Sequence, residues 1–444
     1  MEVLTLSEIA QACGGEFNSD TEINSVCIDT RKITKGCLFI CIRGERFDAH
    51  QFADEALEKG AAAVMISEDI NVNGAYVKVS DTARAMLELS GYYRSKFNIP
   101  VVGLTGSVGK TTTKEFTYLV VNAKYNAIKT LGNLNNEIGL PQMLFQIDEA
   151  VEAAVIEMGM NHFGEIHRLS TAAKPTIGLI TNIGVSHIEF LGSREGILKA
   201  KLEILDGLTE NAPLILNGDN DLLKTVKSDD HKIYFYGMED NADFKAEDIT
   251  EVNGNTEFYV SYFGKKQKIM VPLIGIHNVY NALAAFAVGY CLDIEAEMAA
   301  DAIASYKPEG MRQKSVVING ITSIEDCYNA SPDSMKAALQ TLSATKGNKK
   351  IAVFADMFEL GDYSETAHTD VGRMAAAFNT DYLLCFGNES KHIVNGAKEK
   401  GLENAFWFDN QEALVNKIEE IAQSGDVLVF KASRAMHLEN VISE

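Results

Sequence analysis

Residues 101–112, VVGLTGSVGKTT, join the residue types that hold a nucleotide phosphate. Glycines let successive backbone N–H groups point at one anion, and the N-terminus of a following helix adds partial positive charge. Lys110 is placed to reach the β- and γ-phosphates, and a Thr111 hydroxyl suits Mg²⁺. A plain glycine-rich turn is the competing interpretation. The segment predicts ATP binding by Thr105, Gly106, Ser107, Val108, Gly109, Lys110, Thr111 and Thr112.

The spacing of this loop departs from the strict pattern GxxxxGK[ST], because Leu104 stands where that pattern requires glycine. The loop is the tighter TGxxGKT, which leaves the chemistry open but narrows the family. A P-loop NTPase switch is the alternative from a different functional class. Such a switch would need the strict pattern and a water-positioning residue, and the sequence offers no clear residue for that role.

The apolar strand before the loop and the helix after it place the loop in a central α/β domain, expected over 99–309. Further apolar strands near 153–158, 176–183 and 213–217 indicate a mostly parallel sheet with helices around it. A hairpin is expected around Gly264. The breakers Asn98-Ile99-Pro100 and Lys307-Pro308-Glu309-Gly310 mark the two expected boundaries.

Two smaller α/β domains are expected on either side. Residues 1–98 show strand patterns in VCIDTR, GCLFICIR and AAAVMI and helices near 50–59 and 81–96. Residues 310–444 alternate strands and helices, which predicts a Rossmann-like domain. Its strands are expected near 315–325, 350–355, 381–386 and 426–430, and its helices near 333–344, 365–377, 389–400 and 410–422.

The composition of the 444-residue chain is that of a soluble globular protein, with 46% hydrophobic residues and a formal net charge of −22. The negative charge disfavours nucleic-acid binding. The seven cysteines include no CxxC pair, so reduced thiols are expected. The N-terminus lacks the pattern of a signal peptide, and no apolar run is long enough for a membrane span. We therefore expect a cytoplasmic protein without nucleic-acid or membrane partners.

Collinear motifs along nearly the whole chain resemble the Mur ligase family, the ATP-dependent amide-forming enzymes of bacterial cell-wall synthesis. These motifs are the TGxxGKT loop, DTRKITKGCLFICIRGERFDAHQFADEALEKGA, GNLNNEIGLP, EMGMNHFGEI, HIEFLGSREGILKAKLEI, GIHNVYNALAA, EDCYNASPDSMKAAL and ADMFELGDYSETAH. The resemblance is to the members that add D-alanyl-D-alanine to UDP-N-acetylmuramoyl-tripeptide. It implies that the three domains bind the UDP substrate, ATP and the incoming dipeptide. A monomer is expected, with the oligomeric state left open by the sequence.

The reaction implied by this resemblance has two steps. A peptide carboxylate attacks the γ-phosphate of ATP and forms an acyl phosphate and ADP, and an amine then forms the amide and releases phosphate. Another Mur ligase or a folylpolyglutamate synthetase is the alternative among ligases, but the motifs of the first domain argue against folate. A catalytically inactive binding module is a further alternative. The third residue of the tripeptide stays open.

The resemblance implies a catalytic set of Lys110, Glu157, His187 and Lys201. Glu157 ends the strand AAVIEM at the sheet edge where ligands bind, and a carboxylate suits Mg²⁺. A second Mg²⁺ is implied at His187 and at Lys201, a lysine expected to react with CO₂ to form a carbamate, in preference to Lys199. The purely structural alternatives are a loop-capping carboxylate for Glu157, a hydrogen-bonding side chain for His187 and an unmodified surface lysine for Lys201. The implied metal ligands are Thr111, Glu157, His187 and Lys201.

Further ATP contacts are implied near the second boundary. Asn281 is implied at the adenine with His277 nearby, whereas for Asn278 helix capping explains much of the signal. Arg312 is implied to reach the phosphates, because a guanidinium fork suits oxyanions. Asp326, at the end of the strand ITSIED, is implied to bind the ribose hydroxyls.

Substrate contacts are implied in all three domains. The UDP-sugar candidates, several of which are equally explained as fold residues, are Ser25, Asp29, Thr30, Arg31, Arg43, Gly44, Asp48 and His50. The central candidates are Asn135, Asn136, Asn161, His162 and Arg168, since side-chain amides donate to and accept from sugar and peptide groups. The candidates for the incoming dipeptide are Lys431, Ser433 and Arg434, with Phe354, Asp356, Phe358, Leu360 and His368 near the same pocket.

Overall fold

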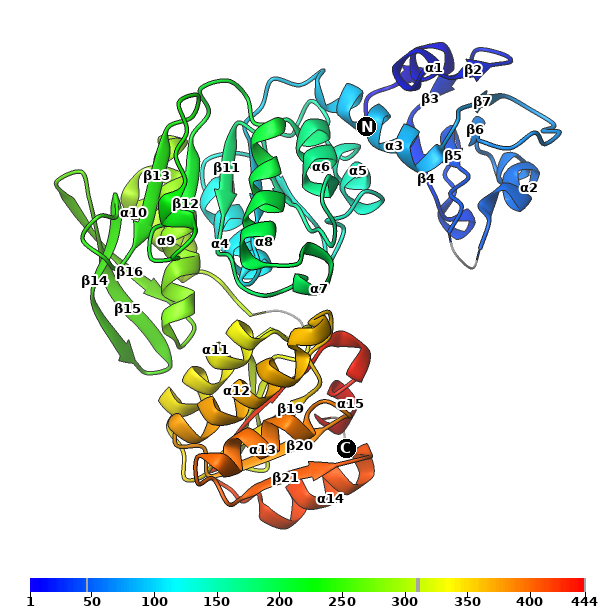
Figure 1. The fold of residues 1–444 in the computed structure, drawn as a ribbon. Helices are drawn as coiled ribbons and strands as arrows, with labels where there is room; N and C mark the ends of the chain where they lie inside the picture. The colour runs from blue at the N-terminus through cyan, green and yellow to red at the C-terminus, as the bar shows by residue number, and fades with distance from the viewer. Residues whose placement is uncertain (45–46, 309–311, 443–444) are drawn as a thin grey trace.

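A computed structural model describes residues 1–44, 47–308 and 312–442 of the chain. Figure 1 shows three α/β domains in chain order, with the central one joined to the N-terminal domain on one side and the C-terminal domain on another. The α/β class and the three-domain architecture expected from the sequence are confirmed.

The N-terminal domain is built on a mostly parallel five-stranded sheet. Its elements are β1 Leu4–Thr5, α1 Leu6–Cys13, β2 Glu16–Phe17, β3 Glu22–Ile23, β4 Ser25–Cys27, β5 Cys37–Ile40, α2 Ala53–Glu58, β6 Ala63–Ile66, β7 Tyr76–Lys78 and α3 Thr82–Arg94. The strand order is β2-β7-β6-β5-β4, and only β2 runs antiparallel to its neighbour. The strand predicted in VCIDTR ends early, at Cys27, because the Asp29 carboxylate accepts the Arg31 N–H (3.0 Å) and turns residues 30–32 into a 3₁₀ helix.

The central domain contains a nine-stranded sheet with the strand order β16-β15-β14-β13-β12-β11-β8-β10-β9. Its strands are β8 Val101–Thr105, β9 Ala127–Lys129, β10 Ala153–Glu157, β11 Ile177–Ile180, β12 Leu214–Asn217, β13 Ile233–Gly237, β14 Phe244–Val252, β15 Asn255–Tyr262 and β16 Lys265–Val271. The hairpin predicted around Gly264 is confirmed as β15 and β16. β14 extends this hairpin to an antiparallel edge that the sequence analysis did not identify.

Helices cover both faces of this sheet. They are α4 Lys110–Asn122, α5 Gly139–Leu144, α6 Glu165–Ala173, α7 Ile188–Leu191, α8 Arg194–Leu202, α9 Ile276–Cys291 and α10 Ala296–Ala304. Side chains of β8 alternate between the two faces, since Val102 and Leu104 pack with α4 and α9 while Val101 packs in the opposite core. β8 is therefore buried on both faces, and its fixed place in the sheet positions the phosphate loop that begins at its carboxyl end.

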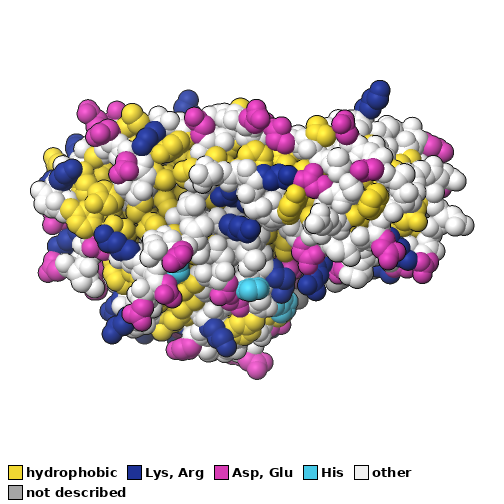
Figure 2. Space-filling view, turned by 90° about the horizontal axis from the view of Figure 1, so that it is seen from above, with side chains coloured by type: hydrophobic (Ala, Val, Ile, Leu, Met, Phe, Trp, Pro, Cys, Tyr) yellow, Lys and Arg dark blue, Asp and Glu magenta, His cyan; other side chains and the backbone are white. Residues whose placement is uncertain are grey.

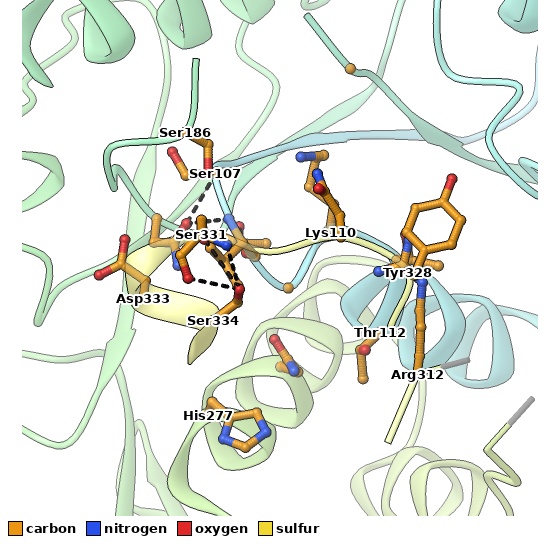
Figure 3. Close-up of a pocket in the computed structure, with 18 of the residues that line it drawn as sticks. Ser107, Lys110, Thr112, Ser186, His277, Arg312, Tyr328, Ser331, Asp333 and Ser334 are labelled. Carbon is orange, nitrogen blue, oxygen red and sulfur yellow. Dashed lines mark hydrogen bonds between the residues drawn. The ribbon is translucent and has the colours of Figure 1, made fainter. Parts of the chain in front are cut away.

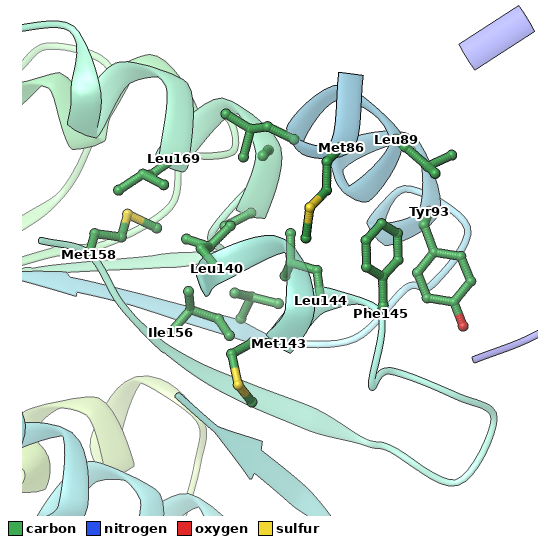
Figure 4. Close-up of a cluster of buried hydrophobic side chains, with 14 of the residues drawn as sticks. Met86, Leu89, Tyr93, Leu140, Met143, Leu144, Phe145, Ile156, Met158 and Leu169 are labelled. Atoms are coloured by element: carbon green, nitrogen blue, oxygen red, sulfur yellow. The ribbon is translucent and has the colours of Figure 1, made fainter. Parts of the chain in front are cut away.

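Helix α3 attaches the N-terminal domain to the central one. Figure 4 shows Met86, Leu89 and Tyr93 of α3 in one apolar cluster with Leu140 of α5 and Leu169 of α6. The Tyr93 hydroxyl also donates to the carbonyl of Ile147 (2.5 Å). Because this cluster excludes water from one face of α3, the N-terminal domain is held on the central domain by packing as well as by the chain.

The C-terminal domain has a six-stranded sheet with the order β17-β18-β22-β19-β20-β21, parallel except for β17, as expected for a Rossmann-like domain. Its elements are β17 Lys314–Ile318, β18 Ile321–Glu325, α11 Pro332–Ala344, β19 Lys350–Ala355, α12 Ser364–Ala377, β20 Tyr382–Phe386, α13 Lys391–Glu399, β21 Ala405–Phe408, α14 Gln411–Ile421, β22 Val427–Lys431 and α15 Glu439–Ile442.

The single strand predicted over 315–325 is wrong. Asn319 and Gly320 both adopt left-handed backbone, with φ of 51° and 80°, and the chain reverses there to pair β17 with β18. Two consecutive left-handed residues are the geometry of a tight hairpin turn, and Asn-Gly is its preferred sequence.

No helix in the described ranges is both long enough and apolar enough to cross a bilayer.

The close packing of α12 on α13 gives the first prediction. A Cβ at Gly372 would lie 1.8 Å from the carbonyl oxygen of Ile393, which is a backbone atom of the facing helix. We expect Gly372→Ala to lower the free energy of unfolding of the C-terminal domain by at least about 2 kcal/mol, because the helices must separate. Thermal unfolding measures this effect, with Thr366→Ala on the exposed side of α12 as the control. Equal stabilities of the two variants would contradict the packing described here.

Candidate active site

A cavity of about 440 Å³ lies between the central and C-terminal domains. Its central wall is formed where β8, β10 and β11 end, and its opposite wall by the start of α11 and the 312–313 and 326–331 segments. Figure 3 shows residues of both domains that line it, among them Ser107 and Lys110 of the phosphate loop and Ser331, Asp333 and Ser334 at the start of α11. The carboxyl ends of parallel strands are where α/β sheets bind ligands, so this is the candidate active site.

The phosphate loop needs glycine at two positions. Gly106 has a φ of 154°, and a Cβ on it would lie 1.8 Å from Thr181 Oγ1. Gly109 is left-handed with a φ of 82°, and its Cβ would lie 2.7 Å from Asn281 Oδ1. Lys110 Nζ donates to the carbonyl of Gly106 (2.8 Å) and so folds back over the loop. Burial lowers the pKa of Lys110, while the nearby Glu157 raises it.

Asn182, which the sequence analysis missed, holds this loop in shape. Its Oδ1 accepts the backbone N–H groups of Ser107 (3.1 Å) and Val108 (2.8 Å), and Thr181 Oγ1 donates to the carbonyl of Val108 (2.7 Å). Asn182 follows β11, the neighbour of β8, at the same sheet edge. The sequence offered one signal for this role: Asn182 is a polar residue just after β11, the strand that pairs with β8.

Thr111, Asn135 and the buried Glu157 form one hydrogen-bonded group that lines the cavity. The Thr111 hydroxyl donates to Glu157 Oε2 (3.1 Å), and Asn135 Nδ2 donates to Glu157 Oε1 (2.8 Å). Thr130 Oγ1 accepts the backbone N–H of Glu157 (2.9 Å). Hydroxyl and carboxylate oxygens are ligands that suit Mg²⁺. Within the described residues, however, no three His, Cys, Asp or Glu side chains cluster as a metal site, so phosphate oxygens would have to complete the coordination.

His187 reaches across the cleft to the C-terminal domain. It precedes α7 in left-handed backbone, and its Nδ1 lies 2.6 Å from Oε2 of Glu359. Burial lowers the pKa of His187, whereas contact with His187 lowers the pKa of Glu359. Glu359 was missed in the sequence, where it lies between Phe358 and Leu360 in a segment expected near the dipeptide pocket.

Lys201 on α8 is 1% exposed. Burial holds the pKa of its amine well below the ordinary range, and the charge of Lys110 lowers it further. In the described part of the chain its Nζ has no hydrogen-bond or ion-pair partner. Lys199, in contrast, is exposed and lies over the ring of Phe163, 5.8 Å from its centre. Of the two lysines, Lys201 alone combines burial with an amine disposed to be uncharged.

The start of α9 lies beside the phosphate loop. Gly275, and not an asparagine, is the N-cap of this helix, which removes the capping interpretation of Asn278. Asn278 Nδ2 instead donates to the carbonyl of Ile274 and to Gln313 Oε1, both at 2.9 Å. Asn281 Oδ1 accepts from Thr113 Oγ1 (3.0 Å). Both asparagines line the cavity, as does Gln313, which the sequence analysis did not single out.

Two further ATP candidates lie on the C-terminal wall. The Arg312 guanidinium stacks over Tyr328, 3.9 Å from the ring centre, and both residues line the cavity (Figure 3). Asp326 pairs with Lys431, whose Nζ donates to Asp326 Oδ2 (2.6 Å) and to the carbonyls of Asp326 and Asn329. Since these contacts occupy all three ammonium hydrogens of Lys431, this lysine holds the 326–329 loop and has no hydrogen left for the carboxylate of a dipeptide.

The other dipeptide candidates also make contacts within the C-terminal domain. Ser433 Oγ accepts the N–H of Phe358 (3.0 Å), and Arg434 pairs with Glu439 (2.9 Å). Phe354 is a buried core residue, as is Leu360. The buried carboxylate of Asp356 and the ring of His368 hold backbone N–H groups of neighbouring segments. Neither Ser433 nor Arg434 lines the cavity described above.

The central substrate candidates divide into two groups. Asn135, Asn136 and Asn161 line the cavity. Asn136 Oδ1 also accepts from the N–H of Gly139 (2.8 Å) at the start of α5. Arg168 forms an ion pair with Glu137 outside the cavity lining.

The UDP-sugar candidates lie in the N-terminal domain, away from the cavity between the other two domains. Their side chains pair mainly with one another and with adjacent turns. Asp48 contacts both His50 Nδ1 (2.6 Å) and Arg43 (2.7 Å), while His50 Nε2 accepts the N–H of Ser67 (2.9 Å). The remaining members of this set are Ser25, Asp29, Thr30, Arg31 and Gly44, of which Ser25 bonds Asn24 and Thr34, and Asp29 bonds Arg31.

Family models match the chain in three consecutive stretches. The model for the Mur ligase family catalytic domain matches residues 22–105, that for the Mur ligase middle domain 104–289, and that for the Mur ligase glutamate ligase domain 311–434. The chain belongs to the Mur ligase family. The phosphate loop, Glu157 and the start of α9 all fall within the middle-domain match of this Mur ligase.

Curated relatives cover the Mur ligase from end to end. The UDP-N-acetylmuramoyl-tripeptide–D-alanyl-D-alanine ligase of Bacillus subtilis (strain 168) is 39% identical to it, over 99% of the chain and 98% of the relative. The enzyme of the same name from Escherichia coli (strain K12) is 35% identical, over 99% and 97%.

Solved structures are similar over the same extent. A crystal structure of MurF from Acinetobacter baumannii has a TM-score of 0.93 at 30% identity, covering 100% of this Mur ligase and 98% of that chain. MurF from Thermotoga maritima in complex with ADP has a TM-score of 0.86 at 28% identity, covering 94% and 96%. A folylpolyglutamate synthase of Mycobacterium tuberculosis, at 15% identity and a TM-score of 0.62, shares the fold alone.

The contacts of Asn182 with the phosphate loop predict how its loss would affect nucleotide binding. Asn182→Ala leaves the Val108 N–H without its acceptor, whereas the Ser107 N–H keeps the backbone carbonyl of residue 182 (3.1 Å), so the loop is held less firmly. We expect the variant to bind a non-hydrolysable ATP analogue roughly tenfold more weakly, because one such contact is worth about 1 kcal/mol or somewhat more. Isothermal titration measures the affinity, with the exposed Asn71→Ala as control. Unchanged affinity would remove Asn182 from the nucleotide site.

Proposed function

We propose that the chain is a UDP-N-acetylmuramoyl-tripeptide–D-alanyl-D-alanine ligase that uses ATP in the synthesis of peptidoglycan precursors. The observation that carries the proposal is the end-to-end similarity to curated enzymes of that name, at 39% identity over 99% of the chain. The phosphate loop, facing a cavity at a domain boundary, supplies the ATP site that such a ligase needs. The structure of the Thermotoga maritima relative in complex with ADP supports the same nucleotide.

The proposed reaction joins two substrates in two steps. A carboxylate oxygen of the tripeptide attacks the γ-phosphorus of ATP, the bond to the β-γ bridging oxygen breaks, and ADP leaves. The amine of D-alanyl-D-alanine then attacks the acyl carbon, loses a proton, and expels phosphate as the amide forms. Lys110 and Arg312 neutralise phosphate charge from opposite walls of the cavity, and closure around the acyl phosphate keeps water away.

Each domain has a place in this scheme. Residues 1–98 would hold the UDP portion, residues 99–309 ATP, and residues 310–444 the incoming dipeptide. The ATP contacts that the cavity supports are the loop residues with Asn278, Asn281, Arg312 and the Asp326 segment. Asn135, Asn136 and Asn161 lie on the same wall as Glu157 and are the residues we assign to the tripeptide end. Arg434 is the cationic candidate for the dipeptide carboxylate, since its half-exposed guanidinium has further N–H groups beyond its pair with Glu439, whereas all three ammonium hydrogens of Lys431 are engaged.

Magnesium ions fit this site by the chemistry of its oxygen donors. Thr111 and Glu157 would hold one ion together with ATP phosphate oxygens, and Mg²⁺ there would neutralise charge on the γ-phosphate. His187 and a carbamate on Lys201 would hold a second. Lys201 suits that modification because an uncharged amine attacks CO₂, and the N–H proton it loses leaves an anion in place of a cation. The buried, unpaired position of Lys201 then becomes useful.

The same proposal includes the location, the partners and the oligomeric state of the enzyme. Both substrates and ATP are small molecules, so we propose a monomer acting in the bacterial cytoplasm, without nucleic-acid or membrane partners. On the face shown in Figure 2, Lys and Arg side chains are scattered among Asp and Glu side chains, as on a surface that does not bind a polyanion. A folylpolyglutamate synthetase is disfavoured, since that likeness extends to the fold alone.

Product analysis tests the activity directly. With UDP-N-acetylmuramoyl-tripeptide and ATP present, we expect ADP and phosphate to appear only when D-alanyl-D-alanine is added. Tripeptides ending in lysine and in diaminopimelate, assayed side by side, identify the third residue. ADP released with single amino acids but not with the dipeptide would replace this assignment by another ligase of the family, and release of AMP would contradict the acyl-phosphate route.

The carbamate on Lys201 makes a separate prediction. We expect Lys201→Ala to lower the rate of ADP release at least tenfold, because a group supporting a metal ligand set is lost. Added acetate or propionate should restore part of the rate by placing a carboxylate in the space left behind. Lys199→Ala, which changes the exposed neighbour, should stay within about twofold of wild type. Full activity in Lys201→Ala, or a loss that no short acid relieves, would count against the carbamate.

A further inference from the structure

The segment 184–191, which includes α7, is one of the parts of the central domain that contact the C-terminal domain, together with the start of α9. A Cβ at Gly184 would lie 2.1 Å from Asp333 Oδ2 at the start of α11, so the two domains approach each other closely there. Val185 and Ile188 pack against the apolar core of the C-terminal domain. We call residues 184–191 the docking segment. His187, a proposed metal ligand, lies in its middle.

The matching surface of the C-terminal domain is the loop after β19. Gly361 lies against the docking segment, where a Cβ would come 3.2 Å from Cγ of Glu189. Two residues earlier, Glu359 places its carboxylate 2.6 Å from Nδ1 of His187. The contact between these two side chains therefore forms only when the two domains are docked.

The loop that carries Glu359 is held at three preceding residues. The Asp356 carboxylate accepts the N–H groups of Glu389 and Ser390 (3.1 and 2.8 Å). Met357 N–H donates to His368 Nε2 (3.0 Å), and the N–H of Phe358 donates to Ser433 Oγ (3.0 Å). These contacts account for Asp356, His368 and Ser433 as supports of the loop, and they aim Glu359 at the cleft.

Both partners of the contact adopt left-handed backbone. The φ of His187 is 66° and that of Glu359 is 62°. Positive φ is uncommon outside glycine, although His adopts it more often than Glu does, and residues kept in it by their surroundings cluster at functional sites. These two left-handed residues meet across the domain boundary, where Gln313, also left-handed, contacts Asn278. The geometry thus marks this pair for a role beyond packing.

The chemistry of the pair follows from which nitrogen is used. A proton on Nδ1 of the neutral ring would face the Glu359 carboxylate oxygen 2.6 Å away, and the lone pair of Nε2 would then be left for another partner. A carboxylate behind a histidine is the common device that fixes the tautomer and orientation of a metal-binding ring. In this chain the carboxylate comes from a different domain.

We infer that Glu359 is a positioning residue, which fixes the ring of His187 across the cleft so that docking of the C-terminal domain completes the site of the central domain. The inference rests on the proposed function, since it assigns His187 to that reaction. If Glu359 has this role, the reaction with ATP depends on the docking of the C-terminal domain against the central domain. The C-terminal domain then contributes to catalysis even where it does not touch the substrate.

Steady-state kinetics of ADP release give the first test. We expect Glu359→Ala to lower kcat roughly tenfold to a hundredfold, with KM for D-alanyl-D-alanine within about twofold of wild type. Glu359→Gln should keep part of kcat, because the amide oxygen can still accept from Nδ1. Asp362→Ala, an exposed acid three residues along the same loop, is the matched control and should match wild type.

A double-mutant cycle separates positioning from other roles. If Glu359 acts through His187, then His187→Ala/Glu359→Ala should be no slower than His187→Ala alone. Independent losses that multiply in the double variant would overturn the inference. So would a raised KM for the dipeptide at unchanged kcat, because Glu359 would then bind the incoming amine.

A spectroscopic readout does not depend on turnover. In protein with ¹⁵N-labelled histidine and a non-hydrolysable ATP analogue, we expect the ring signals of His187, identified by their loss in His187→Gln, to show protonated Nδ1. Glu359→Ala should move them toward the other tautomer, and Asp362→Ala should not. Unchanged signals in Glu359→Ala would overturn the inference. Failure of wild type to use D-alanyl-D-alanine would instead defeat the proposed function, while the tautomer result would still decide the role of Glu359.

Discussion

The parallel register of β8 with β10 and β11 is the constraint on which the rest of the site depends. It brings the carboxyl ends of three strands to one edge, so that Gly106, Glu157 and Thr181 start their loops side by side. Gly106 must then be glycine, because Thr181 Oγ1 occupies the space that a Cβ would fill. The same register places the Glu157 carboxylate under the Thr111 hydroxyl. A shift by one residue would break both contacts together.

This edge supplies only half of a ligase site, and the other half comes from the C-terminal domain. Arg312 and the start of α11 face the phosphate loop across the cavity, and the docking segment sets their distance from it. Burial in a closed cleft strengthens each charge interaction there, because water is excluded. A reactive acyl phosphate needs that exclusion as well. One docking event therefore serves both charge neutralisation and protection of the intermediate.

Local signals explain what the sequence could predict. Glycine spacing around Lys110 and the strand before it located the phosphate loop, and Glu157 was found by its place at a strand end. Lys431 shows the limit. As a lysine after a strand it suggested a ligand, yet its partner Asp326 lies 105 residues away in the chain and pairs with it only in the folded sheet. Glu359 was missed for the same reason, since His187 and its own left-handed backbone give it meaning only in three dimensions.

The buried lysines show how this acidic chain handles positive charge. Lys431 gives all its donors to oxygens of one loop, and Lys114 donates to the carbonyl of Thr130 (2.8 Å) and contacts Glu115. Lys201 is equally buried but has no such partner among the described residues. An unpaired buried ammonium is unfavourable by several kcal/mol, roughly, and the ordinary outcome is loss of its proton. A neutral amine is a reactive group, so the residue that would weaken the fold as an ammonium ion is the one to which we assign the proposed carbamate.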